Sequence, residues 1–232
     1  MKRDSIFFRL FQQSSTLLFK LLEIALEIAM SYSEFKLETL VKDFQITLQE
    51  VSDLFTECSE VQPSEHLSLT LSQNLNLAVA MNTEKARSEM IISPILLEIK
   101  RLRHDQISLF SGVDFTVDAE KGLNGICDFL ISHSSEQLFV RAPVIALVEA
   151  KNENLKSGFA QCMAEMLAAQ VFNQREGNDI PIIYGVVTIG TIWRFLRLTN
   201  QTIELDLTEH FIKDISKILG ILLHAIESPC PR

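Results

Sequence analysis

The segment from Val144 to Lys151 reads VIALVEAK, and the interpretation of the whole chain begins there. Its first five residues are all apolar, as is typical of a strand buried on both faces of a sheet. Side chains alternate along a strand, so Glu149 and Lys151 project from one face, in line with Ile145 and Leu147. An acid and a base are therefore predicted side by side where a core strand ends.

A second acid lies in the strand predicted from Ile126 to Ser132, which reads ICDFLIS. Asp128 has apolar neighbours along both faces of this strand, so an ionised carboxylate there is costly unless a metal ion or a basic group pairs with it. If the two strands are neighbours, Asp128 and Glu149 can hold one divalent cation. Carboxylate oxygens favour Mg²⁺ or Mn²⁺. The alternative is a structural Glu149–Lys151 ion pair, with Asp128 capping a turn.

The segments Leu123–Phe129 (LNGICDF) and Val148–Lys151 (VEAK) resemble the D…E-x-K signature of the PD-(D/E)XK nuclease superfamily. The resemblance covers residues 82–198, with Cys127 where proline would precede the acid. It implies an α/β, restriction-endonuclease-like core, in which helices flank a central mixed β-sheet. It also implies a metal-dependent nuclease that hydrolyses phosphodiester bonds, with DNA as the expected substrate and Mg²⁺ or Mn²⁺ as cofactor. Because some members have lost activity, the alternative is a binding or regulatory module on the same fold.

The resemblance assigns roles to individual residues. Asp128 and Glu149 are expected to hold the metal, and Lys151 to assist the attacking water. Superfamily members often carry a further acid on the first helix and a glutamine on the second, and Glu89 and Gln161 occupy those places here. Glu89 is thus an expected accessory metal ligand, and Gln161 is expected to position the nucleophile. The structural alternatives are a solvated Glu on a helix face and an ordinary Gln near a helix start.

Contacts to nucleic acid require basic side chains. The net charge of −9 opposes such binding, although a metal ion would neutralise part of the acidic charge. The candidate phosphate contacts lie in and just after the predicted first helix: Lys85, Arg87, Lys100, Arg101 and Arg103. The alternative is a charged helix face that is only solvated.

Periodicity and turn residues predict the remaining elements. Apolar residues recur at three- and four-residue steps from Leu37 to Phe55, so residues 1–65 are predicted to form a helical N-terminal extension, and residues 66–232 the nuclease-like domain. The further elements expected are helices Asn82–Leu102 (bent at Pro94), Leu155–Asn173 and His210–Ile226, with strands Val113–Val117, Ile182–Ile189, Ile192–Leu198 and a short one near Ile203.

Composition narrows the class of protein. The chain has 47% hydrophobic and 22% charged residues. So much apolar surface drives a chain to collapse, which excludes disorder throughout the chain. The sequence contains no run of about 18 apolar residues, so no membrane span is predicted. Four scattered cysteines without a C-x-x-C pair favour reduced thiols, and hence a cytoplasmic protein.

Two expectations concern the chain as a whole. The segment Met1–Leu22 resembles the opening of bacterial transposon-associated nucleases, but the sequence that normally follows is missing. Residues 1–29 are therefore expected to contribute little to the fold, with Met30 as the natural beginning. Nucleases that cut both strands commonly pair two sites, so a homodimer is an open expectation.

Overall fold

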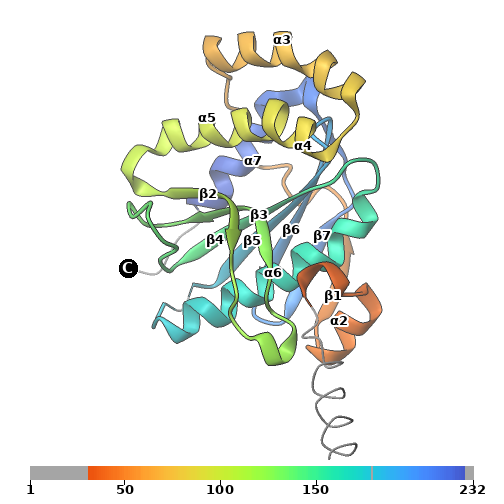
Figure 1. Cartoon of the computed structure of the whole chain (residues 1–232), viewed down its shortest axis with the longest axis vertical. Coiled ribbons are helices and arrows are strands. Elements are labelled where there is room, and N and C mark those ends of the chain that lie inside the picture. Colours follow the sequence, from red (N-terminus) through yellow and green to blue (C-terminus); the bar gives the residue numbers. More distant parts are fainter. Residues whose placement is uncertain (1–30, 179, 228–232) are drawn as a thin grey trace, which may run out of the picture.

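A mixed eight-stranded β-sheet runs through the middle of the molecule (Figure 1). The computed structural model describes residues 31–178 and 180–227. The strand order is β1-β7-β6-β5-β4-β3-β2, and β8 pairs with β6. The pairs β1/β7 and β4/β5 are parallel, whereas the others are antiparallel. Helices cover both faces, so the predicted α/β class with a mixed, helix-flanked sheet is confirmed.

The bounds of the elements follow most of the predicted pattern. The strands are β1 Thr47–Val51, β2 Ser108–Asp114, β3 Ile126–Ser132, β4 Val144–Ala150, β5 Ile182–Thr188, β6 Ile192–Thr199, β7 Thr202–Asp206 and β8 His210–Phe211. The α-helices of the described residues are α2 Leu37–Asp43, α3 Glu65–Met81, α4 Glu84–Arg87, α5 Ser93–Arg103, α6 Leu155–Arg175 and α7 Ile215–Glu227.

Three predicted elements differ in detail. The strand expected at Val113–Val117 begins earlier, because β2 pairs along β3 from Ser108 onward. The helix expected from His210 begins only at Ile215, since His210 and Phe211 pair with β6. The helix expected from Asn82 to Leu102 is divided, because a π-helical turn over Ser88–Ile92 separates α4 from α5 and Pro94 stands in the first turn of α5.

Two apolar cores lie on opposite faces of the sheet. The core beneath α6 contains Leu147 and Met163, and the core beneath α5 and α7 contains Val148 and Leu222. All four side chains are at most 2% exposed. Burial of such a side chain stabilises the fold by about 1.5–3 kcal/mol, so β4 is held from both sides. In the described ranges no helix is long and apolar enough to cross a membrane.

The prediction of a helix from Leu37 to Phe55 is wrong beyond Asp43, where α2 ends. Gln45 adopts a left-handed conformation (φ 55°), which ends the helical path, and Thr47–Val51 forms β1 beside β7. Pairing with β7 supplies hydrogen bonds that local periodicity does not reveal. Tyr32, Phe35 and Leu40 of the same region are buried in the α6-side core. The described part of residues 1–65 is therefore part of the sheet and core rather than a helical extension, and the expectation for residues 1–29 lies outside the described residues.

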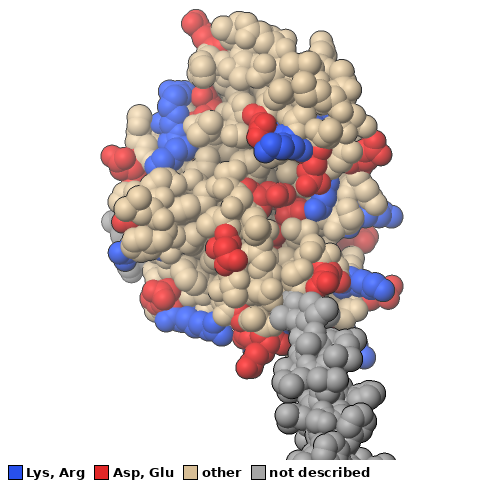
Figure 2. All heavy atoms as spheres, viewed as in Figure 1, with Lys and Arg blue, Asp and Glu red and all other residues tan. Residues whose placement is uncertain are grey.

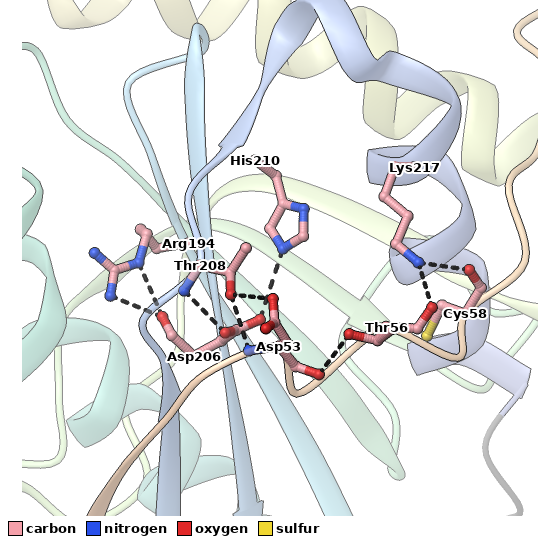
Figure 3. Close-up of polar contacts among 8 residues, drawn as sticks. All are labelled: Asp53, Thr56, Cys58, Arg194, Asp206, Thr208, His210 and Lys217. Atoms are coloured by element: carbon pink, nitrogen blue, oxygen red, sulfur yellow. Dashed lines mark hydrogen bonds and ion pairs between the residues drawn. The ribbon is translucent and has the colours of Figure 1, made fainter.

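Polar contacts tie the segment after β1 to β7 and α7 (Figure 3). The hydroxyl of Thr208 accepts a hydrogen bond from the main-chain N–H of Asp53 at 2.9 Å and contacts its carboxylate at 3.1 Å. The ammonium group of Lys217 donates to the carbonyls of Thr56 and Cys58 at 2.9 and 2.7 Å. These contacts hold the connection between β1 and α3 against the rest of the molecule.

We predict that Lys217→Met lowers the free energy of unfolding by about 1–3 kcal/mol, because two carbonyls lose a charged donor while the aliphatic stem stays. Urea denaturation measures the change. The control is Lys156→Met, at an exposed position in the first turn of α6, which should change stability by less than about 0.5 kcal/mol. Equal effects of the two variants would show that Lys217 does not anchor this segment.

Candidate active site

The pairing of β3 with β4 brings two acids together. Phe129 lies opposite Val148, so the register continued by one residue places Asp128 opposite Glu149. A carboxylate oxygen of Asp128 accepts a hydrogen bond from the main-chain N–H of Ala150 at 2.8 Å, and Glu149 is only 1% exposed. The two strands are thus neighbours, and their acids meet at the end of β4.

Lys151 links these acids to helix α6. Its ammonium group forms an ion pair with Glu149 and donates to the side-chain oxygen of Gln161 at 3.1 Å. The amide nitrogen of Gln161 in turn donates to Glu165 at 3.2 Å. The main chain of Lys151 is held as well, because its N–H donates to the carbonyl of Thr188 at 2.8 Å. The result is a continuous chain of polar contacts from the end of β4 into α6.

Burial dominates the electrostatics of the acids. It raises the pKa of Glu149 to about 8, and the charge of Asp128 adds to the shift while Lys151 opposes it. Burial also raises the pKa of Asp128, against the lowering effects of the Ala150 hydrogen bond and of Lys151. The pKa of Glu165 lies well above its ordinary value because the residue is fully buried and close to Glu149. Carboxylates so placed do not all ionise unless a cation compensates their charge.

The pKa of Lys151 is raised as well, but for a base this favours the charged form. Burial alone would lower the pKa of its ammonium group, but the neighbouring Glu149 outweighs that effect, and Glu84 and Asp128 raise it further. The group is therefore positively charged at neutral pH. The start of α4 lies close to the segment after Lys151, because the side chain of Asn82 donates to Glu153 at 2.7 Å, and Thr83 caps the helix by accepting from Ala86 at 3.1 Å.

The acidic donors fit a small divalent cation. One buried oxygen of Glu149 and one of Glu165 accept no hydrogen bond from an N–H group in the described part of the chain, and the two carboxyl groups lie close to each other. Mg²⁺ is commonly held by one or two carboxylates and several waters, and Asp128 and Glu149 supply two. Among residues 31–178 and 180–227, no group of three or more His, Cys, Asp or Glu side chains is arranged to hold a metal. A cation here would thus rely on this pair and on water.

Glu89 lies apart from this arrangement. Its side chain is 59% exposed and pairs with Lys85 at 2.8 Å, one turn earlier on the same helical segment. No hydrogen bond or ion pair joins it to Asp128, Glu149 or Lys151 where the structure describes the chain. The predicted accessory acid therefore forms its ion pair within its own helical segment, with Lys85 of α4.

Each of the five predicted nucleic-acid contacts binds another group of the protein itself. Arg87 is only 7% exposed and donates to Ile189 and Asn82 at 2.8 and 3.0 Å. The other four bind as follows: Lys85 to Glu89, Lys100 to the carbonyls of His104 and Ile107, Arg101 to Glu98, and Arg103 to Glu227. Acidic side chains gather near the middle of the face shown in Figure 2, below α4 and α5. Arg87 and Lys100 thus bind main-chain carbonyls of the fold, whereas the exposed side chains of Lys85 and Arg101 form ion pairs with acids one helical turn away, which stabilise a fold only weakly.

The sequence did not single out two acids whose charges act on the site, Glu84 and Glu165. Glu84 stands next to the helix cap Thr83, where an acid is ordinarily a favourable first-turn residue. Glu165 lies one helical turn after Gln161, in a stretch whose neighbours Ala164 and Met166 are buried. An acid within such an apolar stretch of the sequence was the available sign that Glu165 is buried.

No protein-family model matches this chain, and the curated proteins contain no significant match. The chemistry of the site must therefore be argued from its own residues.

We predict that the metal-free protein loses stability as pH rises from about 5 to 8. The pKa of Glu149 is higher in the folded than in the unfolded protein, so the protonated side chain favours folding. This stabilising effect is complete at a pH below the pKa of the unfolded state and is lost as the pH rises through about 8. Each such group changes the free energy of unfolding by at most about 1.4 kcal/mol per pH unit. Denaturant titrations at several pH values in EDTA measure the slope.

Glu149→Gln should flatten this slope, because the amide does not titrate. The exposed Glu57 provides the matched control, and Glu57→Gln should leave the slope unchanged. A Glu149→Gln protein with the wild-type pH dependence would mean that Glu149 is not the desolvated acid described above.

Proposed function

We propose that this protein is a metal-dependent nuclease with a restriction-endonuclease-like core. The observation that carries the proposal is the meeting of Asp128, Glu149 and Lys151 at the end of two paired core strands. The order α5, β2, β3, β4, α6, β5 also matches the helix, three strands, helix and further strand of the PD-(D/E)XK superfamily. Both features support the same assignment.

Each residue has a chemical task in this proposal. Asp128 and Glu149 would hold Mg²⁺ or Mn²⁺, which when bound offsets the negative charge that develops on the phosphoryl group. The ammonium group of Lys151 lies beside Glu149, where it can orient the attacking water and stabilise the same charge. Gln161 keeps that ammonium group in place by accepting one of its hydrogen bonds.

In the proposed site Glu84 takes the accessory role that the sequence assigned to Glu89. The negative charge of Glu84 helps to raise the pKa of Lys151, after the larger effects of burial and of Glu149, whereas Glu89 is largely exposed and paired with Lys85. An acid at this position would hold the cation through water or balance the charge of Lys151. For substrate contact, Lys85 is the best of the predicted bases, because its side chain is 82% exposed and follows Glu84 directly.

The alternative is a catalytically inactive module with a binding or regulatory role. The net charge of −9 and the internal contacts of the predicted phosphate-binding residues favour this alternative. Such a module would keep the polar chain of the site but would not hydrolyse DNA.

A cleavage assay on supercoiled plasmid and on single-stranded DNA separates the two functions. We expect Mg²⁺- or Mn²⁺-dependent cleavage by the wild type, and a rate at least about 100-fold lower in Asp128→Asn and Lys151→Met, since each loses transition-state stabilisation of several kcal/mol. Linear plasmid as the first product would indicate paired sites, whereas nicked plasmid would indicate a single site.

Two matched glutamates provide the control. Glu84→Gln should slow cleavage, whereas Glu89→Gln should stay within about threefold of the wild type, because surface substitutions have small effects. Cleavage that persists in EDTA, or an Asp128→Asn protein as active as the wild type, would reject the proposed site. No cleavage by the wild type under any of these conditions would favour the inactive module.

A further inference from the structure

Glu165 is the only acidic residue of α6, and the D…E-x-K signature does not include it. It is 0% exposed and lies between the buried residues Ala164 and Met166. Full burial of an ionisable side chain is rare unless the group is paired. Its carboxylate accepts a hydrogen bond from the amide nitrogen of Gln161 at 3.2 Å and lies close to Glu149. A residue this costly to bury needs a task within the site.

The task follows from the shape of an amide. The oxygen and nitrogen of a glutamine side chain are nearly equal in size, so the amide of Gln161 could face Lys151 either way round. An ammonium group has only donors, and therefore only the oxygen of Gln161 can bind Lys151. Glu165 accepts from the amide nitrogen, which leaves the oxygen pointing toward Lys151 at 3.1 Å.

We propose that Glu165 is a positioning residue that sets the amide orientation of Gln161 and, through it, the place of the Lys151 ammonium group. Gln161 and Glu165 are four residues apart on α6 and so share one face of the helix. Lys151 is then held between two acceptors, Glu149 on its own strand and Gln161 on the helix. Two acceptors restrict a side chain that otherwise has many rotamers. The inference rests on the proposed function for its consequence in catalysis, but the contacts themselves exist without a metal.

The test uses a conservative and a disruptive substitution at Glu165. Glu165→Gln keeps the shape and an oxygen that can accept from Gln161, whereas Glu165→Met keeps the volume and removes the acceptor. Both remove the carboxylate, so a difference between them reports the hydrogen bond rather than the charge. Gln161→Ala removes the intermediate residue, and the double variant Gln161→Ala/Glu165→Met shows whether the two act in one chain.

The first readout is the reactivity of the Lys151 amine in EDTA. Competitive labelling with acetic anhydride, quantified by peptide mass spectrometry against the exposed Lys156, measures it. Glu165→Met and Gln161→Ala should each raise Lys151 labelling by about three- to tenfold, the effect of one lost hydrogen bond. Glu165→Gln should match the wild type, and the double variant should label no faster than Gln161→Ala.

Activity gives the second readout. Glu165→Met should lower kcat by about tenfold with little change in KM, because the substrate-binding groups remain, and Glu165→Gln should restore most of it. A wild type without nuclease activity would contradict the proposed function alone, since the labelling is measured without metal or substrate.

The positioning role is overturned if Glu165→Met leaves Lys151 labelling unchanged, if Glu165→Gln raises it as much as Glu165→Met, or if the effects at Gln161 and Glu165 multiply. Should Glu165→Met fail to fold, hydrogen exchange of the Gln161 side-chain amide in the wild type decides. Slow exchange relative to the exposed Gln73 supports the hydrogen bond to Glu165. Equal exchange rates overturn it.

Discussion

The buried carboxylate of Glu149 is the constraint on which the site depends. A charge at the end of a core strand, only 1% exposed, must be compensated by its surroundings. Lys151 provides part of that compensation from the same strand, while α6 supplies Gln161 to hold the ammonium group. Asp128 on β3 adds a second desolvated acid, which raises the requirement for a cation rather than lowering it. The sheet therefore brings together two acids, Asp128 and Glu149, that do not both ionise readily unless a further positive charge is bound.

The strands that carry the site were predictable because their signals are local. The apolar run before Glu149 predicts burial on both faces, and alternation places Lys151 beside it. The edge strand β1 was not predictable in this way, because its pairing with β7 is a tertiary contact and its apolar spacing also fits a helix. The surroundings of Glu89 were not predictable either, because its pairing with Lys85 and the π-helical turn over Ser88–Ile92 leave no clear mark in the sequence.

Charged residues were the least predictable part of the chain. Arg87 and Lys100 bind main-chain carbonyls near element ends, and this structural use has the same sequence appearance as a phosphate-binding cluster. The reverse holds for Glu165, which belongs to no motif recognised in the sequence and is fully buried in the fold. Two apolar cores stabilise the molecule, while the end of β4 retains acids whose ionisation is opposed by burial. Such a division is expected where a fold carries a site under electrostatic strain.

Titration of the metal-free protein with Mn²⁺, followed by isothermal calorimetry, tests the central claim most directly. The wild type should bind the cation at a site that requires both β-strand acids, so Asp128→Asn should weaken the affinity by about tenfold or more. Equal affinity in the two proteins, or no binding by the wild type, would contradict a metal site built on Asp128 and Glu149.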